Sequence, residues 1–237
     1  QAVQWFRKSS EQGYQPAYLA LGRLYELGQG VQQDYMQALS FYRRVAAEGY
    51  AEAQNRLGAL YREGLGVQQD DKEAYSWFGK SAAQGDPQGC CQLAEMSLLG
   101  LGCEVNEAKA LELFRQAAEQ GYPDAQYHLA QLYETGRVVD LDYQQAATWY
   151  RQAVDQGHAK AQYQLGLMFQ EGRGAPQNFH QAAALFSRAA EQGHTQAQYC
   201  LAGMYQQGVG VPQDNQQAYV WSSLAVAGGC RLAEAQA

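Results

Sequence analysis

The chain has 237 residues, of which 46% are hydrophobic and 17% charged, and its net charge is −7. Its 17 Lys and Arg residues are scattered along the sequence, so the clustered basic patch that nucleic acids and anionic membranes attract is missing. No apolar run approaches the roughly 18 residues of a membrane-spanning helix. We therefore expect neither a nucleic-acid partner nor insertion into a membrane.

The N-terminus, Gln1-Ala2-Val3, has no initiator Met and does not resemble a signal peptide. We expect a processed form or an excised piece, so that any targeting segment lies outside this sequence and the residues leave localisation undetermined. The five cysteines are Cys90, Cys91, Cys103, Cys200 and Cys230. Their number is odd and they form no Cys-x-x-Cys pair, which favours buried free thiols over a disulfide framework.

Three residue types recur every 36 residues without an insertion. Glycine does so at Gly13, Gly49, Gly85, Gly121, Gly157, Gly193 and Gly229. Alanine does so at Ala2, Ala38, Ala74, Ala110, Ala146, Ala182 and Ala218, and leucine at Leu21, Leu57, Leu93, Leu129, Leu165 and Leu201. Chance does not supply three such series in one register, so the sequence predicts tandem structural repeats.

The predicted elements follow this period along the chain. Residues 1–13 supply helix B of a truncated repeat, and residues 230–237 the start of a further helix. Between them lie six full repeats, at 14–49, 50–85, 86–121, 122–157, 158–193 and 194–229. Because neither helix of a repeat can bury its apolar stripe alone, neighbouring repeats must stack. We predict a single solenoid domain over residues 1–237: an all-α, right-handed α/α superhelical solenoid of 36-residue helix-turn-helix repeats.

The first full repeat shows how each unit is built. One helical stripe, predicting helix A, holds Ala17, Leu21, Leu24, Tyr25 and Gly28. A second stripe, predicting helix B, holds Ala38, Phe41, Tyr42, Val45 and Ala46. Gly28 suits the C-terminus of helix A because glycine tolerates a positive φ, and Asp34 suits the N-cap of helix B. We also expect the aromatic pairs Trp5-Phe6, Trp77-Phe78 and Trp149-Tyr150 to be core.

Two repeats depart from the pattern. In the repeat 86–121, Gly89, Ser97 and Cys103 replace the usual Ala, aromatic residue and Val, so we expect this repeat to pack less well than its neighbours. In the repeat 122–157, the loop Gly136-Arg137-Val138-Val139-Asp140 lacks the second glycine, from which we expect an altered turn.

The repeat resembles the Sel-one-like repeats, a branch of the tetratricopeptide-repeat-like solenoids. The residues that carry the resemblance are Ala53-Gln54, Leu57-Gly58, Tyr61, Gly64-Leu65-Gly66-Val67, Asp70, Ala74, Trp77-Phe78 and Gly85, and it extends over essentially the whole chain. The resemblance implies a scaffold whose variable helix-A positions line a concave binding surface. It also slightly favours the bacterial periplasm or cell envelope over the cytoplasm.

Candidate partner-binding residues lie on helix A. Leu98 and Leu99 stand where other repeats mostly carry charged or amide residues, so they form either an exposed apolar anchor or a filling for the space left by Ser97. Three tyrosines and three glutamines complete the predicted surface: Tyr127, Gln131, Tyr163, Gln170, Tyr199 and Gln206. The tyrosines serve either as contacts for an extended partner segment or as partly exposed scaffold.

Recognisable catalytic chemistry is missing from the sequence. There is no HExxH, GxSxG, phosphate-cradling or Cys-x-x-Cys motif, so we expect no catalytic, metal-binding or cofactor-binding residues. His158, His194 and Cys230 follow the repeat glycine but recur one repeat apart, on the order of 10 Å, which is too far for one zinc ion. His158 and His194, like His128 and His180, are expected to be surface or hydrogen-bonded histidines. Some cysteine-rich relatives bind or hydrolyse penicillin-like compounds through paired cysteines, but only Cys90 resembles one member of such a pair.

The sequence therefore predicts a non-catalytic scaffold that binds a partner protein or peptide on its helix-A surface. The resemblance implies a bacterial adaptor, a host-interaction factor or an immunity protein that blocks a toxin. The alternative is a small-molecule binder or hydrolytic enzyme with a pocket between repeats. Self-association through exposed solenoid ends is a further prediction.

Overall fold

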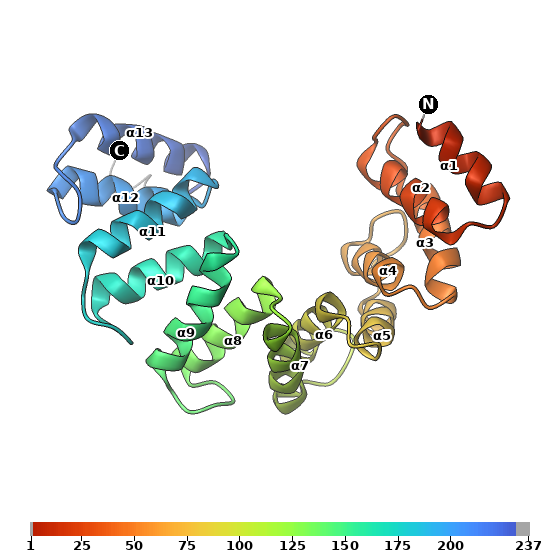
Figure 1. Cartoon of the computed structure of the whole chain (residues 1–237), viewed down its shortest axis with the longest axis horizontal. Coiled ribbons are helices and arrows are strands. Elements are labelled where there is room, and N and C mark those ends of the chain that lie inside the picture. The colour runs from red at the N-terminus through yellow and green to blue at the C-terminus, as the bar shows by residue number, and fades with distance from the viewer. Residues whose placement is uncertain (1, 231–237) are drawn as a thin grey trace. The chain divides into compact units, whose positions relative to one another are not determined.

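The computed structural model describes residues 2–230, which form thirteen α-helices and no strand (Figure 1). The first unit, Gln1–Gln120, holds α1 (Ala2–Glu11), α2 (Gln15–Leu27), α3 (Tyr35–Ala47), α4 (Ala51–Glu63), α5 (Asp71–Ala82), α6 (Pro87–Leu99) and α7 (Glu107–Glu119). The second unit, Gly121–Ala237, holds α8 (Pro123–Thr135), α9 (Tyr143–Asp155), α10 (Ala159–Glu171), α11 (Phe179–Glu191), α12 (Thr195–Gln207) and α13 (Asn215–Ala227). The further helix predicted over 230–237 lies, beyond Cys230, outside the described residues.

The even-numbered helices are helix A of each repeat, and the odd-numbered helices are helix B. Within both units each helix A packs against the helix B that follows it, as Figure 1 shows for α4 and α5 and for α12 and α13. The prediction of an all-α solenoid made of 36-residue helix-turn-helix repeats is confirmed.

The loop between the two helices has the predicted capping at both ends. Helix A ends at a glycine in the left-handed conformation, such as Gly28 with φ 67°. Helix B begins at an Asp or Asn whose side chain accepts backbone N–H bonds, as Asp142 accepts from Gln144 at 2.9 Å and from Gln145 at 3.0 Å. These caps satisfy donors that a helix cannot satisfy itself, and they set where each helix B starts.

The second loop glycine allows one repeat to approach the one before it. A Cβ on Gly102 would lie 2.1 Å from the carbonyl oxygen of Asp71, at the start of the preceding helix B, and a Cβ on Gly210 would lie 2.2 Å from that of Phe179. At the equivalent place Val138 has φ 70°, the same left-handed conformation. The prediction of an altered turn is therefore wrong, because the turn is kept. A β-branched residue occupies the left-handed conformation there, which strains its backbone.

Each core centres on one aromatic ring per helix B. Tyr42, Phe78, Phe114, Tyr150 and Phe186 occupy the same repeat position and are all buried. In three repeats the ring lies on a glycine of its own helix A, since a Cβ on Gly22, Gly58 or Gly166 would meet ring carbon atoms within 3 Å. The prediction that the tryptophans are core is wrong for Trp5, which is 71% exposed, while Trp77 and Trp149 are only half-buried.

The third full repeat is not uniformly looser than its neighbours. Gly89 is buried, and a Cβ there would lie 2.5 Å from the Ser81 hydroxyl oxygen, so the two small residues compensate each other. Ser97 is fully buried and donates its hydroxyl to the carbonyl of Leu93 at 2.8 Å. The predicted looser packing is thus wrong at Gly89, where the helices approach closely.

Candidate partner-binding surface

Two of the predicted tyrosines join one helix A to the next. The Tyr127 ring on α8 lies 5.0 Å from the ring of His158, and the Tyr163 ring on α10 stacks at 4.7 Å on that of His194. Each histidine is the N-cap of the following helix A, α10 or α12. Tyr127 and Tyr163 therefore combine a scaffold role with partial exposure.

The two histidines serve as caps through one nitrogen atom. His158 Nδ1 accepts the N–H of Ala161 at 3.0 Å, and His194 Nδ1 accepts that of Ala197 at 3.2 Å. His158 Nε2 also lies 2.9 Å from Asp124 Oδ1, and this hydrogen bond lowers the pKa of the Asp124 carboxyl group. Burial, followed by the nearby charge of Lys160, lowers the pKa of His194. Both histidines are thus hydrogen-bonded, as predicted.

The tyrosine hydroxyl groups are held by neighbouring polar side chains. Gln131 donates to the Tyr127 hydroxyl at 2.9 Å, and its amide oxygen lies 3.2 Å from His128 Nδ1. Burial raises the pKa of Tyr127 and, together with Cys200, raises that of Tyr163 to about 12. Both hydroxyl groups stay protonated at neutral pH and can donate hydrogen bonds.

The six Tyr and Gln side chains of α8, α10 and α12 form what we name the Tyr–Gln surface: Tyr127, Gln131, Tyr163, Gln170, Tyr199 and Gln206. All of them are half-buried except Gln206, which is exposed. Tyr199 has no histidine after it, because Cys230 occupies that place, and it lines a groove between α12 and α13. The surface offers amide and phenol groups without a formal charge.

The two predicted leucines lie at the end of α6 in the first unit. Leu99 is 61% exposed and Leu98 is half-buried. Leu99 is therefore accessible to a partner, as an anchor requires. The equivalent residue is Glu63 in the repeat before and Glu171 two repeats later, so an acidic side chain is tolerated at this place.

In the first unit, charged pairs cover the face of helix A, which the sequence reasoning missed. Arg56 pairs with Glu26 at 3.4 Å, and Arg62 pairs with Glu95 at 3.4 Å. Glu26 also accepts the hydroxyl of the buried Tyr42, just as Glu134 accepts that of Tyr150 in the second unit. The signal was available, since Glu stands at this helix-A position where the ring is Tyr, and Arg62, Leu98 or Gln170 where it is Phe.

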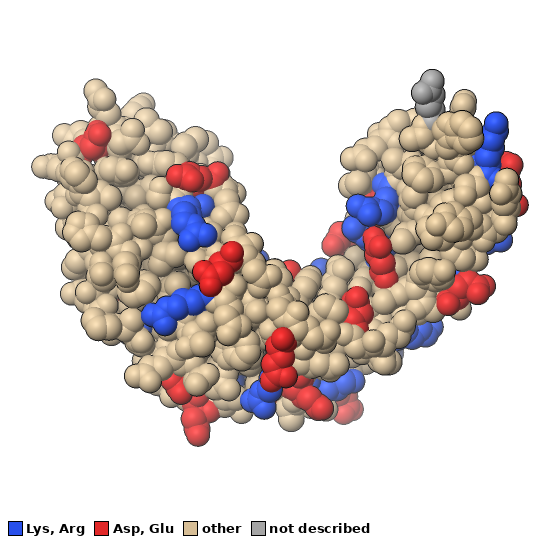
Figure 2. Space-filling view, viewed as in Figure 1, with Lys and Arg blue, Asp and Glu red and all other residues tan. Residues whose placement is uncertain are grey.

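Charges elsewhere follow no single sign. Acidic and basic side chains are interspersed on the face shown in Figure 2, in agreement with the absence of a basic patch from the sequence. Within residues 2–230 no helix is both long enough and apolar enough to cross a membrane.

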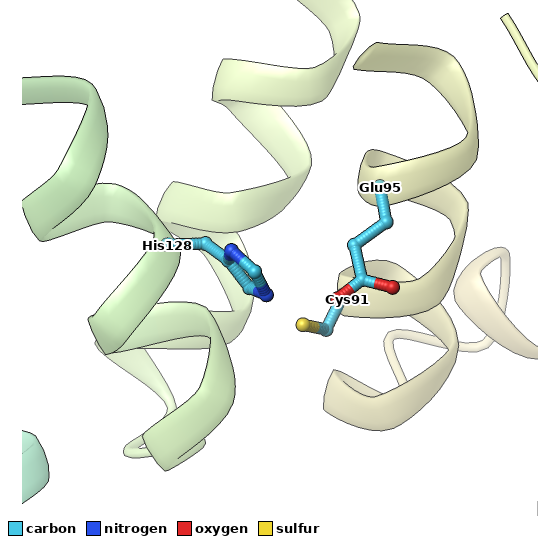
Figure 3. Close-up of side chains that lie close together, drawn as sticks. All are labelled: Cys91, Glu95 and His128. Atoms are coloured by element: carbon cyan, nitrogen blue, oxygen red, sulfur yellow. The ribbon is translucent and has the colours of Figure 1, made fainter. Parts of the chain in front are cut away.

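No disulfide bond joins the cysteines of the described chain, as predicted. Burial raises the pKa of Cys90, and burial together with Cys230 raises that of Cys200 to about 11. Cys91 lies one turn before Glu95 on α6, while His128 belongs to α8 (Figure 3). A thiol whose pKa is raised is a poor nucleophile at neutral pH, which disfavours cysteine chemistry at Cys90 and Cys200.

Comparison with known proteins identifies the repeat. The family model described as the Sel1 repeat matches residues 1–14, 15–50, 51–86, 87–122, 123–158, 159–194 and 195–230. A search of curated proteins found no match.

Solved structures agree with this result. A protective antigen of uropathogenic Escherichia coli with an SLR fold is 35% identical, with a TM-score of 0.80 over 97% of this chain and 49% of that one. This chain thus spans about half the length of that relative. A Sel1 repeat protein from Oxalobacter formigenes is 24% identical, with a TM-score of 0.82 over 94% of this chain and 96% of that one.

An immunity protein from Pseudomonas aeruginosa is 20% identical, with a TM-score of 0.62 over 92% of this chain and 83% of that one. At this identity the likeness concerns the fold alone. The ladder of glycines, alanines and leucines, the capped loops and the family match over seven consecutive segments lead to one conclusion: the chain belongs to the Sel1 repeat family.

Proposed function

We propose that this chain is a non-catalytic scaffold that binds a partner protein or peptide on its helix-A surface. Sel1 repeats generally mediate protein–protein interactions and are generally not catalytic. The proposed contacts are the Tyr–Gln surface in the second unit and Leu98 and Leu99 in the first. The proposed roles are a bacterial adaptor, a host-interaction factor or, as in the Pseudomonas aeruginosa protein of the same fold, an immunity protein.

The observation that carries the proposal is the chemistry of the Tyr–Gln surface. Tyr supplies a large contact area at a low entropic cost, and Gln supplies adaptable hydrogen bonds, a combination typical of protein-binding surfaces. Three successive helices A present these groups, so an extended segment can contact several repeats at once. The charged pairs on α2 and α4 make the corresponding face of the first unit chemically different.

The test compares the intact chain with variants that the repeats themselves show to be tolerated. Gln131 and Gln170 stand at the places of Arg23 and Arg62 in the first unit, so the double variant Gln131→Arg/Gln170→Arg should fold normally. Leu99→Glu reproduces Glu63 of the preceding repeat. Each immobilised protein is used to capture partners from soluble and envelope fractions of the source organism, and affinity is then measured with the purified partner.

We expect the intact chain to retain a partner that the double variant binds at least about tenfold more weakly, a loss of about 1.4 kcal/mol. Leu99→Glu tests the contact in the first unit separately. The matched control is Gln144→Arg, which makes the same chemical change at an exposed place on α9. If both helix-A variants bind every partner as tightly as the control does, the proposed surface is wrong.

A further inference from the structure

Two junctions in the second unit join one helix A to the next in the same way. The Tyr127 ring of α8 lies 5.0 Å from that of His158, the N-cap of α10. The Tyr163 ring of α10 stacks at 4.7 Å on that of His194, the N-cap of α12. In both junctions the histidine that supports the tyrosine ring also holds the first turn of the next helix A, because its Nδ1 atom accepts a backbone N–H.

The two junctions differ in the charge beside the histidine. His158 Nε2 lies 2.9 Å from Asp124 Oδ1, so protonation of this ring would turn an existing hydrogen bond into an ion pair. The equivalent residue, 36 positions later, is Lys160, and its charge acts on His194. A carboxylate stabilises an imidazolium ion, whereas an ammonium group repels it. The α8–α10 junction therefore has a counter-ion for a protonated histidine, and the α10–α12 junction has a repelling charge.

The charged groups of α11, which packs against α12, have partners of their own. Arg188 donates to a backbone carbonyl of α9 at 3.2 Å, and Glu191 accepts a hydroxyl group of its own helix at 3.1 Å. His180 stands at the opposite end of α11. Neither α12 nor α13 has an Asp, Glu, Lys or Arg. Lys160 is therefore the charged side chain that faces His194 within residues 2–230.

The cap of α12 depends on an unprotonated Nδ1 atom. His194 Nδ1 accepts the N–H of Ala197 at 3.2 Å, and a second proton on the ring would turn this acceptor into a donor. Two N–H groups would then face each other, and a positive charge would stand at a helix N-terminus, where the macrodipole disfavours it. The stacked Tyr163 ring attracts a cation, but burial and Lys160 outweigh this attraction, since they lower the pKa of His194. Protonation of His194 therefore removes the cap.

The same cap supports a residue of the Tyr–Gln surface. Tyr163 contacts α12 through its ring, which lies on His194, and through its hydroxyl group, which is hydrogen-bonded to the Cys200 thiol in the second turn. Cys230, after α13, acts electrostatically on both Tyr163 and Cys200, whereas Tyr219 of α13 is exposed. Both contacts of Tyr163 are thus with the end of α12 that the cap holds in place.

We propose that the α10–α12 junction makes the Tyr–Gln surface sensitive to pH: neutral His194 caps α12 and holds Tyr163 in place, and a proton taken up from the solvent at Nδ1 releases both. The α8–α10 junction stays closed, because a protonated His158 forms an ion pair with Asp124. The consequence for partner binding rests on the proposed function, whereas the release of α12 does not.

The experiment follows the tyrosine and histidine rings of the full chain by NMR as the pH is lowered from about 7.5 to about 5. Tyr163→Phe and Tyr127→Phe assign the two tyrosine signals. We expect the Tyr163 signals to move toward those of unfolded tyrosine as His194 titrates, with a midpoint below about pH 6.5, the usual pKa of histidine. The Tyr127 signals should stay those of a folded ring over the same range.

Two reciprocal substitutions exchange the charges of the two junctions. Lys160→Asp supplies the counter-ion that the first junction has, so it should abolish the response of Tyr163 to acid. Asp124→Lys removes that counter-ion and should make Tyr127 respond as Tyr163 does in the parent chain. The Lys160→Asp result is decisive by itself if Asp124→Lys does not fold.

The matched control is Lys72→Asp, which makes the same charge change at an exposed place on α5. It should leave the responses of both tyrosines as they are in the parent chain. Far-UV circular dichroism at about pH 7.5 verifies that each variant is folded.

Partner affinity tests the consequence for the Tyr–Gln surface. A partner bound to the closed junction should bind the parent chain at least about threefold more weakly at pH 5 than at pH 7.5, because fewer chains are in the competent state. Lys160→Asp should keep most of its affinity at the lower pH.

Two results would overturn the proposal. Tyr163 signals that stay constant while His194 titrates would show that the junction remains closed on protonation. An equal loss of affinity in the parent chain and in Lys160→Asp would assign the pH dependence to another group. Failure of the proposed function is a separate result, because it appears at pH 7.5 as unchanged binding by Gln131→Arg/Gln170→Arg.

Discussion

Val138 is the sole non-glycine residue with a positive φ among residues 2–230. The other repeats place glycine here, which favours the left-handed conformation, and at Gly66, Gly102, Gly174 and Gly210 the backbone of the preceding helix B also leaves no room for a Cβ. Val is the least suitable kind of residue for this conformation, since its Cβ is branched. The fourth full repeat therefore keeps its turn at a cost in stability.

We expect Val138→Gly to stabilise the folded chain by about 1 kcal/mol. The substitution removes strain that costs about 1–3 kcal/mol at such a position. Part of this gain is lost because glycine raises the conformational entropy of the unfolded chain. Urea unfolding followed by circular dichroism measures the change. Val139→Gly, one residue further on, is the control and should be neutral or destabilising. A Val138→Gly variant no more stable than the parent chain would show that the turn is unstrained.

For single residues, the sequence predicts where caps and core residues stand better than it predicts which partner each side chain contacts. The spacing located Asp34 as a cap, and the structure confirms it. It gave no account of the buried Tyr42 hydroxyl, which needs an acceptor and finds it in Glu26, a residue of another helix. The sequence also predicted wrongly that Trp5 is buried. A repeat position that belongs to the core in most repeats is buried only where neighbouring helices cover it.

At the scale of the helix, the N-caps of helix B are uniform, whereas those of helix A vary and include Asp86 of α6 as well as histidine. Every helix B from α3 onward begins at Asp or Asn, whereas α10 and α12 begin at histidine. A histidine cap accepts the backbone N–H only through an unprotonated Nδ1, so the cap of α12 depends on the charge state of His194. The sequence marked His194 as hydrogen-bonded without showing that its partner is the backbone.

We expect stability to fall as the pH falls below about 6.5, the usual pKa of histidine. The pKa of His194 is lowered in the folded chain by burial and by Lys160, so the unfolded chain binds the proton more readily. The contribution of this group is complete above about pH 6.5 and is lost as the pH falls through that value to the folded pKa. Unfolding in urea at several pH values measures it.

His194→Asn isolates this effect, because Asn caps a helix and does not titrate. The variant should lose part of the pH dependence between pH 5 and 7 while keeping most of the stability of the parent chain at pH 7.5. An unchanged pH dependence would mean that His194 does not couple protonation to folding.

At the scale of the whole molecule, the two units present different chemistry on the same helix-A face. Charged pairs join α2 to α4, whereas the six side chains of the Tyr–Gln surface on α8, α10 and α12 are uncharged, although Glu134 of α8 pairs with Arg173. The fold class and the repeat length could be predicted because they depend on a period of 36 residues that recurs along the whole sequence. The pairing of Arg56 with Glu26 could not, because the sequence does not show which side chains of two successive helices A face one another.

This difference leads to a prediction for partner binding. Affinity at the Tyr–Gln surface should change by less than about threefold between 50 and 500 mM salt, because screening acts on charges and the six side chains of this surface carry none. Titration calorimetry with the captured partner, using a constant buffer, measures it. A steep loss of affinity with salt would place the contact on charged residues instead.

The close approach of Gly102 to Asp71, and of Gly210 to Phe179, bears on how such a chain evolves. Four of the six full repeats meet the one before them through the same glycine and the first residue of the preceding helix B, so these junctions are interchangeable. Loss or duplication of one 36-residue segment would join two ends that already fit. Repeat number can therefore change by recombination within the gene without a new interface having to arise, whereas an insertion of any other length would displace every later helix from its partner.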